Sequence, residues 1–358
     1  MTTENQKETT EHHKEKSNTP KIILAVILLI LVGGVIYGSK FYKIYFAPNI
    51  SGNGAYLYIK TGSNLDSLYS EIKRKDLLND EDAFKQAAVK MDLAQHLKPG
   101  RYRLTKKLNN RTLINMIKAG NQDPVKLKFH NIRKKEDFAG YVAKNMEADS
   151  ASFLKVIDSA ALDQKYGFTT DNVYTMFIPN TYDMYWNTSP VEFFTRMEKE
   201  YEKFWTAERK QKAALLNMSP QQVTIMASIV DGEALYDKEM PIIAGLYLNR
   251  LNRGILLQAD PTVIFANNDF TVKRVTNALL RVDSKYNTYK YLGLPPGPIM
   301  MPSINAIDAV LNHDKNNYIY MCAKADFSGY HAFAETKAQH EINANLYRAA
   351  LNKRKIFK

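Results

Sequence analysis

The longest apolar stretch of the chain lies near its N-terminus. Residues 1–20 are polar and charged, whereas residues 22–38, IILAVILLILVGGVIYG, carry no charge. A helix of this length spans the hydrocarbon layer of a membrane, and aromatic residues at its end are typical anchors at the membrane surface. Four aromatic residues follow the run: Phe41, Tyr42, Tyr45 and Phe46. The pattern predicts one transmembrane helix over residues 21–38.

We expect residues 1–20 to form a cytoplasmic tail and the chain after the span to lie outside the cytoplasm, at the cell (inner) membrane. Lysines flank both ends of the span, so the positive-inside rule decides little about this orientation. The alternative is a cleaved signal peptide. The long charged leader and the absence of an A-x-A site before Lys40 favour a retained helix.

Between the predicted span and residue 122, the pattern is that of short strands and amphipathic helices. NISGNGA (residues 49–55) is rich in turn formers, and we expect residues 39–54 to form a linker. AYLYIK alternates as a strand does, and two helices follow, the first capped by Ser63. A Pro-Gly turn enters a second strand, and a last helix ends at Gly120. Residues 55–122 are therefore predicted to form a small α+β module.

The rest of the chain, residues 123–358, has the pattern of a larger mixed α/β domain. VKLKFHNI (residues 125–132) alternates as a strand, and helical periodicity dominates the segments that follow. The aromatic, turn-rich segment FIPNTYDMYW (residues 177–186) is expected to be a loop. After Ala259 the sequence predicts loops and short strands, then a helix, a strand and a C-terminal helix after Thr336. The fold class expected for the whole chain is α+β.

Composition indicates a folded, basic protein. Of its 358 residues, 45% are hydrophobic and 24% are charged, which is typical of globular domains. The formal net charge of +12 suits a nucleic acid, an anionic membrane or an acidic polymer. Lys and Arg are spread along the chain, and no recognition-helix, zinc-finger or aromatic RNA-binding pattern occurs. We therefore expect no nucleic-acid partner.

The sequence carries no cofactor signature. It has neither a G-x-x-x-x-G-K-[ST] phosphate loop nor an H-E-x-x-H zinc motif. His331 and His340 lack the spacing of metal ligands, and we expect them to be surface or core residues. Cys322, the only cysteine, is predicted to be a buried, inert thiol. No metal or organic cofactor is expected.

The strongest candidate chemistry lies in ASIVDGEALYD (residues 227–237), which places two acids two positions apart. Upstream, the segment Ser219-Pro220-Gln221-Gln222 predicts a helix start, with Ser219 as cap and Pro220 at the first helical position. Helical phase then puts Glu233 on the apolar stripe, seven residues after Met226. Asp231 lies about 200° around the helix from Ile229, on the flank.

A carboxyl on the apolar stripe is desolvated, and desolvation raises its pKa toward the range of a general acid. The neighbouring Gly232 would let a ligand or another backbone approach closely. The alternative is that the helix ends near Gly232 and both acids are solvated, or that Glu233 pairs with an arginine.

Polar residues in apolar surroundings downstream are further candidates for a site. They are Asn249, Arg250, Gln258, Asp260, Tyr286 and Asn287. Arg250 lies in the middle of a predicted helix and is the candidate partner of either acid. Gln258 and Asp260 fall in a predicted strand and turn, where Pro261 limits strand pairing.

Six segments in order resemble the motifs of the endolytic murein (peptidoglycan) transglycosylases of the YceG-like family. They are ASIVDGEA, LYLNRL, GILLQADPTVIF, YNTY, GLPPGPI and HAFAETKAQH. The single N-terminal span, LKPGRYRL and IPNTY fit as well. The resemblance runs over roughly residues 50–350, and six ordered motifs are far more specific than any one of them.

The resemblance implies a membrane-anchored lyase with a LysM-like subdomain over residues 55–122 and a catalytic domain over residues 123–358. Such an enzyme cuts glycan strands internally between MurNAc and GlcNAc, leaves 1,6-anhydroMurNAc ends, and limits strand elongation near the membrane. The implied partners are peptidoglycan strands, the membrane and, as candidates, peptidoglycan synthases.

The family's motif, A-S-I-[IV]-E-x-E-[TA], has its catalytic glutamate at the second acidic position, which is Glu233 here. The first acid is Asp231 instead of Glu, and this departure favours a supporting role for Asp231. The six downstream polar residues would support the acid or orient the sugar and its N-acetyl group.

Two alternatives stay open at this point. The chain is a membrane-anchored, non-catalytic peptidoglycan-binding scaffold if Glu233 only holds Arg250. A membrane-anchored nucleic-acid binder is the more remote alternative, and it would need steeply salt-dependent DNA binding.

Overall fold

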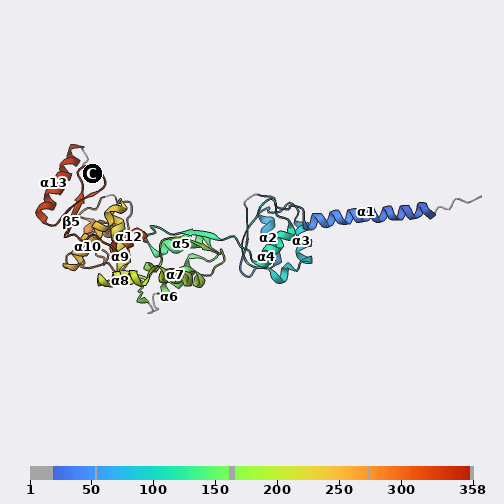
Figure 1. Ribbon diagram of the computed structural model, residues 1–358, viewed down its shortest axis with the longest axis horizontal. Coiled ribbons are helices and arrows are strands. Elements are labelled where there is room, and N and C mark those ends of the chain that lie inside the picture. The colour runs from blue at the N-terminus through green and yellow to red at the C-terminus, as the bar shows by residue number, and fades with distance from the viewer. Residues whose placement is uncertain (1–18, 53–54, 161–165, 273, 355–358) are drawn as a thin grey trace, which may run out of the picture. The chain divides into compact units, whose positions relative to one another are not determined.

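The computed structural model describes residues 19–52, 55–160, 166–272 and 274–354. The chain divides into two compact units, residues 1–123 and 124–358 (Figure 1). The sequence expectation placed this boundary between residues 122 and 123. Most of the expected cytoplasmic tail, residues 1–18, lies outside the described residues.

The first unit begins with helix α1 (Thr19–Tyr45), which from Lys21 onward is long and apolar enough to cross a membrane. Its most apolar part has a mean hydropathy of 2.7, and its apolar side chains are exposed. The helix does not end at Gly38 but continues through residues 39–45. These residues include lysines, which end the uncharged run, but no proline or glycine, so nothing in them breaks a helix.

The prediction that residues 39–54 form a linker is wrong for the described residues, 39–52. After the helix, the chain packs onto the first unit: the Asn49 side-chain amide donates hydrogen bonds to the Asp80 carbonyl and to Asn110 Oδ1, both at 2.8 Å. Ile50 is buried and forms a bridge with Leu78. Turn-forming composition predicts irregular backbone, but it does not say whether that backbone is held by neighbours.

The remainder of the first unit has the predicted order of strand, two helices, strand and helix. Its elements are β1 (Tyr56–Ile59), α2 (Leu65–Arg74), α3 (Glu81–Lys90), the short 3₁₀ helix η1 (Leu93–His96), β2 (Gly100–Arg103) and α4 (Asn110–Ala119). β1 and β2 are antiparallel, with Tyr56 opposite Arg103. The cap of α2 is Asn64 rather than Ser63, because the Asn64 side chain accepts the Ser67 backbone N–H.

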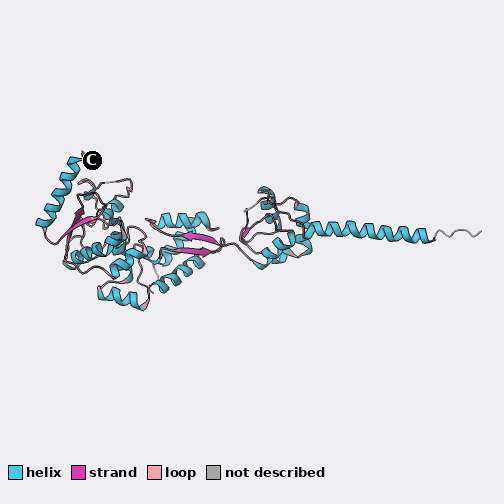
Figure 2. Ribbon diagram, turned by 45° about the horizontal axis from the view of Figure 1, so that its top comes forward, coloured by secondary structure: helices cyan, strands magenta, loops and turns pink. Residues whose placement is uncertain are grey.

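Over its described residues the second unit is mainly helical, with two two-stranded antiparallel sheets, β3–β4 and β5–β6 (Figure 2). Its first half contains β3 (Val125–Lys128), α5 (Lys135–Asn145), α6 (Ser150–Ala160), η3 (Val173–Met176), β4 (Thr181–Met184), α7 (Pro190–Phe204) and α8 (Ala207–Leu215). Its second half contains α9 (Pro220–Glu233), η4 (Asp237–Glu239), α10 (Met240–Asn252), α11 (Asp260–Asn267), η5 (Leu279–Arg281), α12 (Ile304–Leu311), β5 (Tyr320–Ala323), β6 (His331–Ala334) and α13 (Lys337–Lys353).

Three predictions for this unit need correction. Its sheets pair strands in antiparallel fashion, so it is α+β and not α/β. The expected loop over residues 177–186 contains β4, which pairs with β3 because Tyr182 and Met184 alternate into the core. The expected strand and turn around Asp260 is helix α11, with Pro261 in its first turn, where a missing N–H costs nothing.

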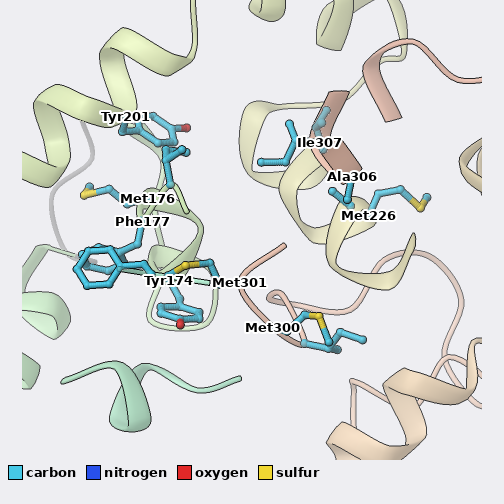
Figure 3. Packing of buried hydrophobic residues seen from close by; sticks show 14 of the residues in the cluster. Tyr174, Met176, Phe177, Tyr201, Met226, Met300, Met301, Ala306 and Ile307 are labelled. Atoms are coloured by element: carbon cyan, nitrogen blue, oxygen red, sulfur yellow. The ribbon is translucent and has the colours of Figure 1, made fainter. Parts of the chain in front are cut away.

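Helix α9 is the centre of the second unit's core. Eight consecutive residues of α9, from Val223 to Val230, are buried, and α8, α10, α11 and α12 pack around them. Figure 3 shows Met226 of α9 beside Ala306 and Ile307 of α12. A helix buried on nearly all sides explains why its sequence is apolar almost all round.

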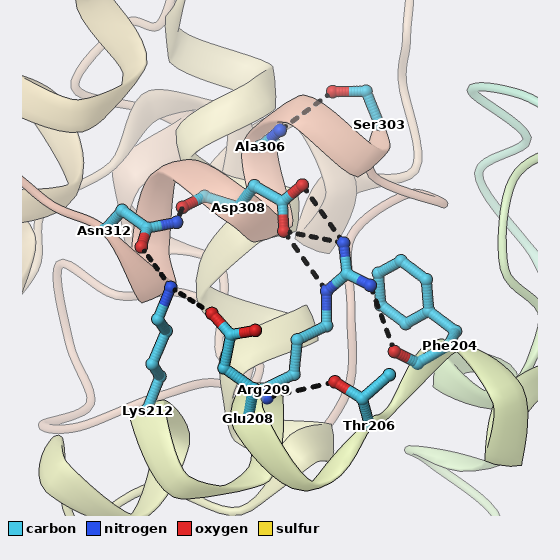
Figure 4. Close-up of polar contacts among 9 residues, drawn as sticks. All are labelled: Phe204, Thr206, Glu208, Arg209, Lys212, Ser303, Ala306, Asp308 and Asn312. Atoms are coloured by element: carbon cyan, nitrogen blue, oxygen red, sulfur yellow. Dashed lines mark hydrogen bonds and ion pairs between the residues drawn. The ribbon is translucent and has the colours of Figure 1, made fainter.

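Helix α12 is held against α9 from outside by α8. The Arg209 guanidinium donates to both carboxylate oxygens of Asp308, the shorter contact being 3.0 Å (Figure 4). Lys212 Nζ donates to Asn312 Oδ1 at 2.8 Å and pairs with Glu208 at 3.0 Å. The contacts of Arg209 with Asp308 and of Lys212 with Asn312 fix α12, and with it the loop that precedes it, against α8.

The burial of Met226 predicts a large loss of stability on truncation. Met226→Ala is expected to lower the free energy of unfolding by about 2–5 kcal/mol, because it leaves a cavity between α9 and α12. Unfolding in urea is followed by tryptophan fluorescence, since both tryptophans, Trp186 and Trp205, lie in the second unit. Leu215→Ala is the matched control, because Leu215 is 78% exposed, and an unchanged midpoint for Met226→Ala contradicts the packing described.

Candidate active site

Helix α9 delivers Glu233 as its last residue. The start signal is confirmed: Ser219 Oγ accepts the Gln222 backbone N–H, and Gln222 Oε1 accepts the Ser219 N–H at 2.8 Å. The helix ends at Glu233, with Ala234 as its C-cap, so it ends close to where the solvated alternative placed it. Glu233 is nevertheless half-buried, because its stripe neighbour Ile229 is fully buried and other elements close over the helix end.

Gly232 allows helix α11 to reach the end of α9. A Cβ atom at Gly232 would lie 3.0 Å from Pro261 Cβ and 3.2 Å from Pro261 Cγ. The prediction that Gly232 admits a close neighbour is therefore confirmed, and that neighbour is Pro261. Since Pro261 follows Asp260, the approach places the N-terminus of α11 next to Glu233.

Two groups contact the Glu233 carboxyl. The Tyr247 hydroxyl, from α10, donates a hydrogen bond to Oε1 at 3.0 Å. Burial is the main cause that raises the pKa of Glu233, to about 7, and the charge of Asp260 adds to it. The hydrogen bonds from Tyr247 and from the Asp260 backbone N–H act in the opposite direction. The carboxyl is therefore half protonated near neutral pH, as the helical phase predicted.

Asp260 forms a second acidic position beside Glu233. Its Oδ1 accepts a hydrogen bond from the Tyr289 hydroxyl at 2.6 Å. Burial, followed by this bond and the negative charge of Asp260, raises the pKa of Tyr289, so the hydroxyl stays a donor. Asp260 therefore lines the pocket with its carboxyl held by the Tyr289 hydroxyl.

Glu233 and Asp260 line a pocket of about 710 Å³ in the second unit. The α9–α11 side and the loop after α10 contribute Glu233, Leu246, Tyr247, Arg250, Leu257, Gln258, Asp260 and Tyr289. The opposite side comes from β5, β6 and α13, and it includes Tyr320, Cys322, His331, Lys337, His340, Glu341 and Arg348. A polar pocket of this size, with one acid of raised pKa, is the arrangement expected of an active site.

Three residues on the side of the pocket formed by β5, β6 and α13, which we call the far wall, have environments that the sequence did not predict. Cys322 is half-buried and lines the pocket, so the prediction of a buried thiol is wrong, although burial raises the pKa of the thiol. His331 also lines the pocket, and its backbone N–H and Nδ1 contact the buried Glu239 carboxylate at 2.7 and 2.8 Å. His340 stacks on Tyr320 with ring centroids 5.2 Å apart. Within the ranges that the structure describes, no three His, Cys, Asp or Glu side chains are grouped as a metal site.

Asp231 lies outside this pocket and supports the fold. Its carboxylate accepts the Ser303 backbone N–H at 2.9 Å and the Ser303 hydroxyl at 3.0 Å. Ser303 is the N-cap of α12, so Asp231 ties the end of α9 to the start of α12. Burial raises the pKa of Asp231, and the two bonds from Ser303 oppose that rise.

Three of the candidate substrate-binding or supporting residues do not line the pocket. The Asn249 side chain donates to the carbonyls of Asn316 and Tyr318 at 2.8 and 3.0 Å. Asn287 is buried and donates to two backbone carbonyls of its own loop, both at 2.9 Å. Tyr286 packs against Phe265 and lines a different cavity. Asn249 and Asn287 are polar residues in apolar surroundings because their side chains hold neighbouring loops.

Arg250 lines the pocket but is not the partner of either acid. Its guanidinium donates to the carbonyls of Leu256 and Ile319, each at 2.8 Å, and to Gln258 Oε1. The prediction of an ion pair with Glu233 or Asp231 is therefore wrong. Arg250 instead joins α10 to β5 and orients Gln258, which brings both residues into the pocket wall.

Two tyrosines at the site, Tyr247 and Tyr289, were absent from the set expected from the sequence. Tyr247 precedes Arg250 by three residues on α10, so helical spacing places both on one face. That spacing could have predicted from the sequence that Tyr247 lies at the same site as Arg250. Tyr289 belongs to the YNTY segment, but only its contact with Asp260 distinguishes it from Tyr286.

Comparison with known proteins points to one family. The model of the YceG-like family matches residues 57–346. The endolytic murein transglycosylase of Bacillus subtilis (strain 168) is 26% identical over 345 residues, which cover 91% of this chain and 93% of that protein. The endolytic murein transglycosylase of Streptococcus pneumoniae (strain D39) is 27% identical over 156 residues, 42% of this chain and 27% of the longer pneumococcal protein.

The fold is similar to a solved structure as well. The crystal structure of a YceG-like protein from Listeria monocytogenes has a TM-score of 0.53 and 25% sequence identity. The similarity covers 81% of this chain and 98% of that one.

The raised pKa of Glu233 predicts a pH-dependent contribution to stability. Between its ordinary value of 4.5 and about 7, the folded state holds a proton that the unfolded state has released. Stability is therefore expected to fall as the pH rises through this window, by on the order of 3 kcal/mol in total. Glu233→Gln should remove that fall and be the more stable protein at pH 8.

The measurement is urea unfolding of both proteins from pH 4.5 to pH 8 by tryptophan fluorescence. Glu208→Gln, the same change at a residue whose side chain is 74% exposed, is the control and should keep the pH dependence of the parent. Parallel curves for the Glu233→Gln variant and the parent would show that Glu233 ionises normally.

Proposed function

The chain belongs to the YceG-like family, and on that premise we propose that it is a lyase, an endolytic murein transglycosylase that acts through Glu233. The observation that carries the proposal is a half-buried carboxyl with a pKa of about 7 in the wall of a 710 Å³ polar pocket. The substrate is a peptidoglycan glycan strand, cut internally between MurNAc and GlcNAc.

One acid suffices for this reaction. Protonated Glu233 donates its proton to the glycosidic oxygen, and the bond from that oxygen to the muramyl C1 breaks. The resulting carboxylate then accepts the proton of the muramyl C6 hydroxyl as this oxygen bonds to C1. The products are a 1,6-anhydroMurNAc end and a free GlcNAc hydroxyl, and no water is consumed. An acid whose pKa lies near neutral pH serves both steps.

Asp260 and the tyrosines support this cycle. The negative charge of Asp260 raises the pKa of Glu233. It also stabilises the positive charge that develops at C1 in the transition state. Tyr289 holds Asp260 by its hydroxyl, and Tyr247 holds Glu233 in one rotamer. Gln258, oriented by Arg250, is the residue we assign to the N-acetyl group of the sugar.

The two units have separate roles in the proposal. Helix α1 crosses the inner membrane once, with residues 1–20 in the cytoplasm and both units outside it. Within the first unit, residues 55–122 form a LysM-like module that holds a strand near the membrane, and the catalytic domain over residues 123–358 cuts it. Cleavage close to the membrane limits strand elongation, and peptidoglycan synthases are the partners this location suggests.

The scaffold alternative is less well supported. It required Glu233 to be the partner of Arg250, whereas the Arg250 guanidinium contacts two carbonyls and Gln258. Among the residues that the structure describes, no cationic side chain pairs with Glu233, and an unpaired half-buried acid costs free energy that strand binding alone does not require.

The proposal predicts that Glu233→Gln strongly slows strand cleavage. The full-length chain and the variant are incubated with purified glycan strands, and the products are identified by mass spectrometry. The parent should yield 1,6-anhydro ends, and the variant should be slower by about 100-fold or more, because a general acid contributes 10²–10⁴. Glu208→Gln, an exposed acid on α8, is the control and should cleave normally.

Two outcomes contradict the proposal. Reducing ends without anhydro ends indicate a hydrolase, in which water attacks C1. Equal cleavage by the Glu233→Gln variant assigns the chemistry to another residue.

Tyr247→Phe is expected to shift the pH dependence of cleavage upward. The hydrogen bond from Tyr247 lowers the pKa of Glu233, so its loss keeps Glu233 protonated to a higher pH. The rate of the parent should fall above about pH 7, where Glu233 loses its proton, and the fall should begin at higher pH in the variant. Rates are measured from pH 5 to pH 9.

The matched control is Tyr182→Phe, which removes a buried tyrosine hydroxyl that donates to the Ile178 carbonyl; neither residue lines the pocket. It should leave the pH profile unchanged. A lower rate for the Tyr247→Phe variant at every pH, without a shift of the profile, would show that Tyr247 does not tune Glu233.

A further inference from the structure

A second cavity, of about 700 Å³, lies in the first unit between the end of α1 and helix α3. We call it the α1–α3 groove. Its lining consists of Tyr37, Lys40, Phe41, Ile44 and Tyr45 from α1 and Lys85, Gln86, Val89 and Lys90 from α3. Unlike the pocket around Glu233, it is mainly apolar and has lysines at its edge.

The groove is a fixed feature because α1 is fastened to the unit at this end. The Asn110 side chain donates to the Ile44 carbonyl at 2.8 Å, which caps the last turn of α1. Lys43 Nζ pairs with Asp80 at 3.0 Å, next to the start of α3. The membrane helix therefore continues into the folded unit without a hinge in residues 39–45.

The apolar side chains of the groove are exposed although α3 has a well-buried face. Ala83, Phe84, Ala87 and Ala88 of α3 pack into the core. On its outer face, Val89 is 66% exposed, and across the groove Tyr37 is 74% and Phe41 46% exposed. Apolar surface that continues directly from a membrane-crossing helix is typical of contact with lipid.

The charges at the groove are those that an anionic lipid requires. Within the described part of the first unit, Lys40 and Lys90 have no ion-pair partner, and Lys85 lies 3.9 Å from the exposed Asp82. Asp80, the N-cap of α3, pairs with Lys43 at 3.0 Å. Lysines on flexible stems next to apolar side chains suit a phosphate above an acyl chain.

The length of α1 places this groove at the membrane surface. No charged residue occurs from Ile22 to Ser39, a run that a helix extends over about 27 Å. The hydrocarbon layer is about 30 Å thick. When Ile22 lies at one edge of that layer, the opposite edge falls near Phe41, which lines the groove. Val89 and the lysines then lie at the level of the lipid head groups.

We propose that the α1–α3 groove binds an anionic phospholipid of the bilayer and thereby seats the first unit on the membrane surface. The acyl chain lies against Tyr37, Phe41 and Val89, and the phosphate contacts Lys40, Lys85 and Lys90. The proposal rests on α1 crossing the membrane and does not depend on the reaction proposed for Glu233. It gives the first unit a defined height above the bilayer.

The test measures whether position 89 is in contact with lipid. Cys322 is the only cysteine, so Cys322→Ser gives a full-length chain without cysteine, to which Val89→Cys adds one site for a nitroxide label. The chain is reconstituted in vesicles of equal parts phosphatidylcholine and phosphatidylglycerol. Collisions with oxygen, which dissolves in lipid, are compared with collisions with a water-soluble nickel chelate. Lys73→Cys, on the exposed face of α2, is the matched control.

The label at position 89 should meet oxygen more often than nickel, and the label at position 73 the reverse. Lys85→Glu combined with Lys90→Glu should lower the ratio of seated to unseated chains roughly 25-fold or more, since each lysine near an anionic surface contributes about fivefold to that ratio and the glutamates add repulsion. Lys60→Glu combined with Lys73→Glu, two exposed lysines outside the groove, should leave the label at position 89 in contact with lipid.

Equal nickel access at positions 89 and 73 overturns the proposal. Contact with lipid that persists in pure phosphatidylcholine and after the Lys85→Glu and Lys90→Glu changes overturns the anionic ligand. Contact that appears only when a polyprenyl phosphate is added overturns the bulk phospholipid in favour of a lipid carrier. None of these results depends on strand cleavage, so they are distinguishable from failure of the proposed reaction.

Discussion

The second unit is organised around the burial of one carboxyl at the end of a buried helix. A charged Glu233 loses water contacts in this position, and the hydrogen bonds from Tyr247 and the Asp260 N–H replace only part of them. The neutral form therefore persists up to about pH 7. The end of α9, the start of α11 and the middle of α10 must all meet at this point for the site to exist.

Three consecutive residues at the end of α9 carry three different tasks. Asp231 binds Ser303 and so anchors α12, Gly232 admits Pro261 of α11, and Glu233 enters the pocket. Successive residues of a helix point about 100° apart, so neighbours in the sequence face different elements. This explains why two acids two positions apart have environments that differ so strongly. It also explains why an Asp suits position 231, where the short side chain reaches the backbone of a neighbouring cap.

The far wall of the pocket, formed by β5, β6 and α13, depends on a second acid, Glu239, which is buried and bound to His331. Glu239 accepts both the backbone N–H and Nδ1 of His331, which joins η4 to strand β6 across 92 positions of sequence. That contact fixes β6, its partner β5 and the following helix α13 opposite Glu233. The similarity to the YceG-like family extends to residue 346, so it includes this wall as well as the acid. The pocket is thus a product of the whole second unit.

The sequence by itself determined the features that follow from local periodicity and composition. These include the apolar N-terminal helix, the start of α9 at Ser219, the burial of Glu233 and the distinction between Glu233 and Asp231. Only the tertiary structure decided which polar residues meet that acid. Asn249, Asn287 and Arg250 satisfy backbone carbonyls, whereas Tyr247 and Tyr289 contact the two acids of the site. The physical reason is that a polar side chain among apolar neighbours must find a partner, but its partner lies on another element, and helical or strand phase carries no information about that distance.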